Sequence, residues 1–177
     1  MKKFCISFLI VAIIILSVIG LNLPNNAVHE EYLRIHIRAD SNLDDAQAVK
    51  YKVRDAVVEY LTPFIAECKT KAQAESMLKD QIDKIEQVAD GVLKNFGFDY
   101  KSTAKIKSEE FPTRVYGGLE LESGIYDALI IELGSGKGDN WWCVVYPPLC
   151  FVGESSGYQY RSKIKDVIDR FYSNKEK

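Results

Sequence analysis

The sequence predicts an α+β domain, with a mainly antiparallel sheet of about four strands and helices packed on one face, in the order β-α-α-β-β-β-α. Polar and apolar residues alternate along 31–38 and again along 100–108, as they do in half-buried strands. Between these two stretches, apolar residues recur at helical spacing in two long segments. Two stretches that favour strands follow, at 124–133 and 141–146.

The first strand has two contrasting faces. Leu33, Ile35 and Ile37 share one face, which we expect to point into the core because strand side chains alternate. The opposite face carries Arg34, His36 and Arg38. Two arginines and a histidine suit either a solvated face or part of a partner-binding surface, and the pattern leaves both interpretations open.

Two helices are expected next. Asp44 or Asp45 offers an N-cap for the first, with acidic groups at the positive end of the helix. Pro63 closes this helix or starts a short turn after it. Thr70 caps a second, longer helix that stops at 95–97.

The remaining elements are strands and a final helix. The lysines of 100–108 point to one side, which suits an exposed or edge strand. Residues 111–123 are irregular in pattern. The glycine-rich loop 134–140 joins strand 124–133 to the tryptophan-containing strand, and we interpret this pair as a hairpin. Apolar residues at helical spacing along 164–171 predict a C-terminal amphipathic helix.

The tryptophan-containing strand also carries a candidate disulfide. Trp141 and Trp142 point to opposite faces, and the prolines at 147–148 end the strand. The chain can then turn and bring Cys150 back towards Cys143. A bond across so short a loop would stabilise the fold by about 2.5 kcal/mol. In a reducing compartment the same residues would be two buried thiols.

The N-terminus indicates the compartment. Lys2 and Lys3 precede an apolar run over 4–20, the pattern of an export signal or a retained membrane anchor. We therefore divide the chain into a signal peptide or anchor at 1–23, a linker at 24–30 and a single exported domain at 31–173. Lysines only on the N-terminal side place the domain outside the cytoplasm. Export favours the Cys143–Cys150 disulfide and leaves Cys68 as a small apolar residue near a helix end.

Composition and motifs exclude several functions. The chain carries a formal net charge of −2, which argues against a general binder of nucleic acids or anionic membranes. Residues 134–138 lack the Ser or Thr and the following helix of a phosphate loop. Residues 153–157 match a nucleophile elbow, but His29 and His36 both precede it. Two histidines and one short cysteine spacing fit no common zinc site, so neither metal nor cofactor is predicted.

Two blocks of the sequence resemble the stage II sporulation protein R family. The first block covers 33–41 and 47–57, and the second covers 111–117, 124–129 and 136–150. The tetrapeptides Asn-Trp-Trp-Cys and Pro-Pro-Leu-Cys in the last segment are the most specific part of the resemblance.

The resemblance implies a signalling protein rather than an enzyme. Members of this family are made in the forespore of endospore-forming bacteria and exported into the space between the forespore and mother-cell membranes. There they activate a membrane-embedded aspartic protease of the mother cell, which removes the pro-sequence of sigma-E. The alternative function that we consider is a cell-wall-acting enzyme or carbohydrate-binding domain.

A receptor-protease needs a contact surface on this chain. We expect it on the polar face of the first strand and, as a second choice, at the start of the tryptophan-containing strand, because Arg and Trp are common binding anchors. The candidate contact residues are Arg34, His36, Arg38, Arg54, Arg114, Asn140, Trp141 and Trp142. For each of them a purely structural role is the competing interpretation.

Overall fold

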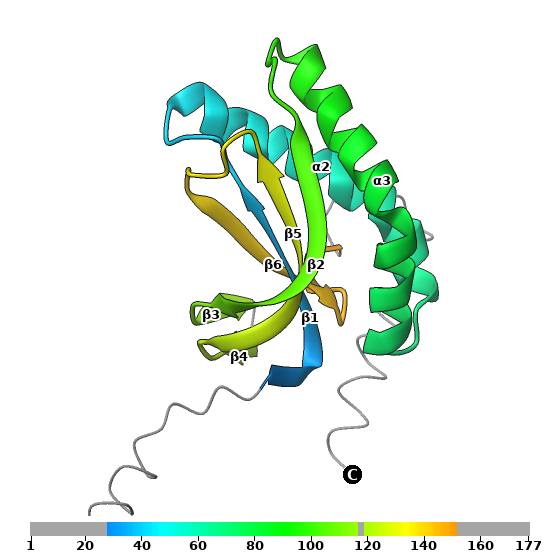
Figure 1. Ribbon diagram of the computed structural model, residues 1–177. Helices are drawn as coiled ribbons and strands as arrows, with labels where there is room; N and C mark the ends of the chain where they lie inside the picture. The colour runs from blue at the N-terminus through cyan, green and yellow to red at the C-terminus, as the bar shows by residue number, and fades with distance from the viewer. Residues whose placement is uncertain (1–27, 117–118, 152–177) are drawn as a thin grey trace, which may run out of the picture.

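The computed structural model describes residues 28–116 and 119–151 (Figure 1). In chain order the elements are β1 (Val28–Arg38), α2 (Asp44–Glu67), α3 (Lys71–Asn95), β2 (Ser102–Phe111), β3 (Arg114–Tyr116), β4 (Leu119–Leu121), β5 (Gly124–Leu133), β6 (Asn140–Tyr146) and the 3-10 helix η1 (Leu149–Phe151). The predicted signal or anchor at 1–23 and the predicted helix at 164–171 lie outside the described residues.

The main sheet is mixed, which corrects the mainly antiparallel sheet expected from sequence. Its four strands lie in the order β2-β5-β1-β6. β2 pairs with β5 and β6 pairs with β1 in antiparallel fashion, but the central pair, β1 and β5, is parallel. The α+β class and the four strands of the main sheet are confirmed.

The predicted hairpin between β5 and β6 is wrong, because β1 lies between them. The loop 134–139 passes around the end of β1, where it hydrogen-bonds to the chain that leaves this strand. Gly138 N donates to Ala39 O over 2.8 Å, and Ser135 N donates to Asp40 Oδ1 over 2.7 Å. Lys50 Nζ of α2 also donates to a loop carbonyl, at 3.0 Å. These contacts hold β5 and β6 on opposite sides of β1.

The two helices match their predicted positions more closely than their predicted ends. Leu43 is the N-cap of α2 and makes no side-chain cap, so the expected Asp44 or Asp45 cap is wrong; both acids lie in the first turn. Pro63 lies inside α2 rather than ending it. The N-cap Thr70 of α3 accepts from Gln73 N, as predicted.

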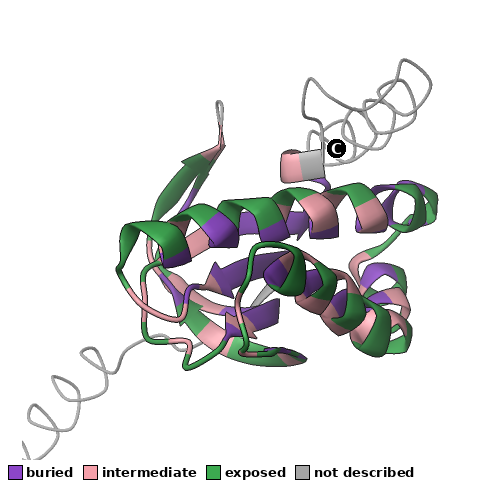
Figure 2. Cartoon of the chain, turned by 90° about the horizontal axis from the view of Figure 1, so that it is seen from above, coloured by how far each residue is buried: buried purple, intermediate pink, exposed green. Residues whose placement is uncertain are grey.

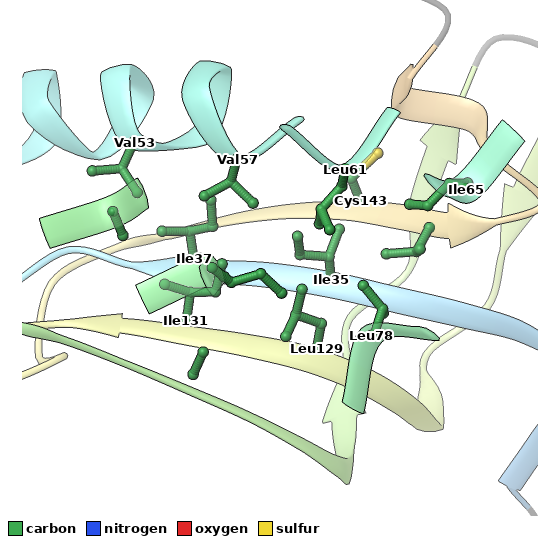
Figure 3. Packing of buried hydrophobic residues seen from close by; sticks show 14 of the residues in the cluster. Ile35, Ile37, Val53, Val57, Leu61, Ile65, Leu78, Leu129, Ile131 and Cys143 are labelled. Atoms are coloured by element: carbon green, nitrogen blue, oxygen red, sulfur yellow. The ribbon is translucent and has the colours of Figure 1, made fainter. Parts of the chain in front are cut away.

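Two clusters of buried side chains cover the strands. The larger one takes residues from both helices and from the Leu33, Ile35 and Ile37 face of β1. Figure 3 shows β1 and β5 side chains pointing towards those of α2, among them Val57 and Leu61. The outer surfaces of the helices are largely exposed (Figure 2). That both helices cover one face of the sheet stays a prediction.

The smaller cluster lies on the other face of the strands. It contains Tyr32, Phe111, Tyr126 and Val144, together with Leu121 of β4. β3 and β4 form a separate two-stranded sheet within the segment that the sequence pattern left irregular. β2 curves strongly towards this small hairpin (Figure 1), so its far end contributes Phe111 to the smaller cluster.

β2 is an edge strand, as its outward lysines predicted. Two of its backbone amides are bonded to carboxylates of α3. Ser102 N donates to Asp90 Oδ1 and Ala104 N to Glu86 Oε1, each at 2.7 Å. These two amides are therefore occupied, and a strand of another chain cannot pair with them without displacing α3 side chains.

Cys143 and Cys150 form a disulfide bond, with their Cα atoms 6.2 Å apart. The bond ties η1 to β6. Cys68 is a free and buried cysteine at the C-cap of α2. This position agrees with the small apolar residue near a helix end that the sequence predicted. No helix within 28–116 and 119–151 is long and apolar enough to cross a membrane.

Two glycine substitutions should shift stability in opposite directions. A Cβ at Gly138 would overlap the backbone carbonyl of Ser41, whereas one at Gly91 of α3 would meet nothing within 4 Å. Gly138→Ala should therefore destabilise the fold by about 1–3 kcal/mol. Gly91→Ala should stabilise it by about 0.4–1 kcal/mol. Urea denaturation measures both, and equal effects of the two changes would contradict the loop packing.

Candidate partner-binding face

The polar row of β1 lies on the face that carries the smaller cluster. Arg34, His36 and Arg38 alternate with the buried apolar residues of the same strand. Their environments differ, because burial decreases along the row: Arg34 and His36 are fully buried, whereas the side chain of Arg38 is 23% exposed. Each residue is therefore considered separately.

Arg34 is a buried cation surrounded by aromatic rings. Its guanidinium lies 4.3 Å from the centre of the Phe111 ring and 4.8 Å from that of Tyr126. Nη2 donates to Tyr116 Oη over 2.9 Å, which ties the β3–β4 hairpin to the central strand. Nε and Nη1 have no hydrogen-bond partner among the described residues. Cation–π contacts thus provide much of the environment of this charge.

Arg34 also affects its tyrosine neighbours. Burial raises the pKa of Tyr116, and the Arg34 charge and hydrogen bond oppose this rise without cancelling it. The phenol therefore stays protonated at neutral pH. Because Arg34 is fully buried, a partner could contact it only after the side chains around it had moved.

His36 is a neutral aromatic link between two strands. Its ring stacks on Trp142 of β6 with centroids 4.7 Å apart and planes 4° apart. The Phe111 ring meets the His36 ring edge-on, with centroids 5.3 Å apart. Nε2 lies 3.3 Å from Glu109 Oε2. Burial lowers the pKa of His36 to about 4, although the Glu109 carboxylate opposes the shift. The imidazole is therefore uncharged at neutral pH.

Arg38 is the centre of a charged network at the open end of the row. It pairs with Glu132 Oε1 of β5 at 2.7 Å and with Glu109 of β2. Lys105 Nζ reaches Glu132 Oε2 at 2.7 Å, and Lys107 Nζ reaches Glu109 Oε2 at 3.4 Å. We call Arg38, Lys105, Lys107, Glu109 and Glu132 the charged network.

Both carboxylates of the charged network are held ionised. The hydrogen bond from Lys105 lowers the pKa of Glu132, with burial opposing it and the charges of Lys105 and Arg38 adding to it. Burial alone would raise the pKa of Glu109, but the charge that His36 gains when acid protonates it, together with the charge and hydrogen bond of Arg38, outweighs this effect and lowers the pKa. The ion pairs therefore persist well into the acidic range.

The structure separates the predicted contact residues into three places. Asn140 lies opposite Arg38 and Trp142 opposite His36 in the pairing of β6 with β1, so both belong to the same region as the polar row. Trp141 packs instead against the larger cluster, where the Arg54 guanidinium lies 5.7 Å from its ring. Arg114 is exposed on β3. The contact role of every one of these residues stays a prediction.

The sequence interpretation missed the acidic and aromatic partners of the polar row. Glu109 follows Lys105 and Lys107 at the strand period of two, so this spacing could have identified it. Glu132 carried no comparable signal, because its contact with Arg38 depends on the parallel pairing of β1 and β5.

Charged and aromatic side chains make up this face. Within 28–116 and 119–151, no three His, Cys, Asp or Glu residues are grouped so that they could hold a metal ion. The groups that do converge are ion pairs, a neutral imidazole and a half-buried indole. Trp and Arg side chains of this kind are enriched at the energetic centres of protein interfaces.

Comparison with known proteins identifies the family. Residues 29–156 match the family described as Stage II sporulation protein R, a span that includes nearly every described element. The chain belongs to the stage II sporulation protein R family. It is 30% identical over 149 residues to the Stage II sporulation protein R of Bacillus subtilis (strain 168). The aligned segment covers 84% of this chain and 65% of that protein. No solved structure matches.

Family membership confirms the resemblance seen in the sequence and supports a role in sporulation. The chain spans about 65% of the length of its Bacillus relative, so the activity and partners of that whole protein are not transferred with the family name. The polar row, the charged network and the disulfide all lie within the span that matches the family.

Acidification should expose the cost of protonating His36. The pKa of His36 lies near 4 in the fold and near 6.5 in the unfolded chain, so the unfolded chain binds more protons between these values. The contribution of neutral His36 to the free energy of unfolding is fully present above pH 6.5. It is lost as the pH drops towards 4, by up to about 3 kcal/mol. His36→Phe keeps the stacking on Trp142 and should flatten this slope. Denaturant unfolding from pH 7 to 4.5 measures it, and parallel curves for the two proteins would contradict the buried neutral imidazole.

Charge reversal should destabilise the fold at buried Arg34 much more than at an exposed arginine. Arg34→Glu places an unpaired carboxylate in a fully buried position and should destabilise the fold by about 3 kcal/mol or more. Arg114→Glu, on the exposed surface of β3, should change stability by less than about 0.5 kcal/mol. Thermal unfolding of the two variants provides the comparison, and a stable Arg34→Glu protein would contradict the burial of this side chain.

Proposed function

We propose that this chain is an exported sporulation signal that activates a membrane-embedded aspartic protease of the mother cell and so triggers the processing of pro-sigma-E. The observation that carries the proposal is the family match over 29–156, because it includes nearly the whole described domain. The chain itself acts as a ligand and not as the protease.

Two features support a place outside the cytoplasm, in the space between the forespore and mother-cell membranes. The basic and apolar N-terminus has the pattern of an export signal or membrane anchor. The disulfide between Cys143 and Cys150 is of a kind that persists in oxidising compartments. Together they favour a secreted, stapled domain that meets its partner at the membrane surface.

Activation by such a ligand requires differential binding. A ligand shifts a conformational equilibrium only to the extent that it binds the active state more tightly than the inactive one. A hundredfold preference corresponds to about 2.7 kcal/mol, a typical coupling energy. The rigid packing of Trp142 on His36 and the fixed position of Arg38 support this role, since a preorganised surface loses little entropy on binding.

Reconstitution tests the proposal directly. The exported form of the chain, the membrane-embedded protease and a pro-sigma-E substrate are combined in vesicles, and each protein is omitted in turn. We expect processing only when chain and protease are both present. Equal processing without the chain, or cleavage by the chain alone, would overturn the proposal.

A further inference from the structure

The charged network carries an excess of positive charge. It contains the three cations Arg38, Lys105 and Lys107 and the two carboxylates Glu109 and Glu132. Three cations face two carboxylates, so one positive charge is in excess, and the two lysines are the most exposed groups of the network. The whole chain has the opposite sign, at −2, which sets this face apart from the average surface.

The outer cations of this face are accessible and exchange partners at little cost. The side chains of Lys105 and Lys107 are 45% and 46% exposed, and each makes one ion pair in the charged network. Exposed ion pairs contribute about 0–1 kcal/mol. An incoming carboxylate can therefore replace Glu132 or Glu109 as the partner of a lysine without disturbing the fold.

The inner groups are fixed. Arg38 stays bound between two carboxylates, one from β2 and one from β5. Beside it, the half-buried Trp142 is held flat against His36. Rigid Arg and Trp side chains on the same face of the sheet as exposed lysines have the composition of a binding hot spot with a charged rim.

The nearby strand edge is unsuited to pairing with another strand. Asp90 and Glu86 already accept the amides of Ser102 and Ala104 on β2. A partner at this part of the sheet is therefore recognised by side chains on the face rather than by added backbone hydrogen bonds.

We propose that the face formed by Arg38, Lys105, Lys107 and Trp142 binds an acidic segment of the partner protein. This inference rests on the proposed function, in which that partner is the membrane-embedded protease. Carboxylates of the segment pair with the two lysines, and its backbone or an apolar side chain packs on the indole. The attraction between the exposed lysines and the acidic segment also speeds association at low salt.

A charge-reversal pair tests this surface. Lys105→Glu/Lys107→Glu inverts the rim of the face, whereas Lys84→Glu/Lys94→Glu makes the same change of charge at exposed positions of α3. In the reconstituted system we expect at least a tenfold loss of activation for the first variant, none for the second, and unchanged circular dichroism for both. Full activation by the Lys105→Glu/Lys107→Glu protein, or equal losses in the two variants, would overturn the proposal.

A second measurement needs no protease, so its failure is distinguishable from failure of the proposed function. The exported protein is titrated with hexaglutamate, with hexalysine and with phosphatidylglycerol vesicles, and amide and indole shifts are followed by NMR. Shifts at Lys105, Lys107 and Trp142 with hexaglutamate alone would support the inference. Shifts elsewhere, or at this face with vesicles only, would overturn it. If hexaglutamate maps to this face while the wild-type protein activates nothing, the face stands and the proposed function fails.

Discussion

The structure depends on the central position of β1, whose two faces are both covered. β5 and β6 pair with it on either side, and strand alternation sends Leu33, Ile35 and Ile37 into one cluster and the polar row into the other. The burial of Arg34 and His36 and the partial burial of Arg38 must be compensated at each position. Aromatic rings surround Arg34, His36 remains neutral, and Arg38 pairs with two carboxylates.

This compensation links the fold to the proposed role. The polar row passes from a fully enclosed cation at Arg34 to partly exposed ion pairs at Arg38. The enclosed end holds the β3–β4 hairpin through Tyr116, and the open end presents the charged network beside Trp142. One strand thus supplies both the internal attachment and the groups proposed for recognition, so a change at the buried end is expected to alter folding before it alters binding.

Local sequence signals predicted the elements well but not their neighbours. Alternation identified β1 and β2, and the cap Thr70 and the stop near Gly97 identified the ends of α3. The glycine-rich loop before β6 has the composition of a hairpin turn, yet its hydrogen bonds go to the end of β1. Pro63 was a similar case, because a proline within a long helix costs one hydrogen bond that tertiary packing can offset. A period of two likewise assigns Arg34 and His36 to a face without telling whether that face is covered.

The same limit shows why the proposed contact surface could be outlined only in part from the sequence. The pattern brought Arg38 and Trp142 forward as candidates, but equally Arg34, which is buried, and Arg54, which belongs with Trp141 and the larger cluster. Recognition depends on which charges are both exposed and in excess, and that balance is set by the carboxylates of β2 and β5 that fold against β1. Because surface ion pairs exchange at little cost while the stacked indole stays fixed, such a face can discriminate between two states of a partner through the position of a few carboxylates.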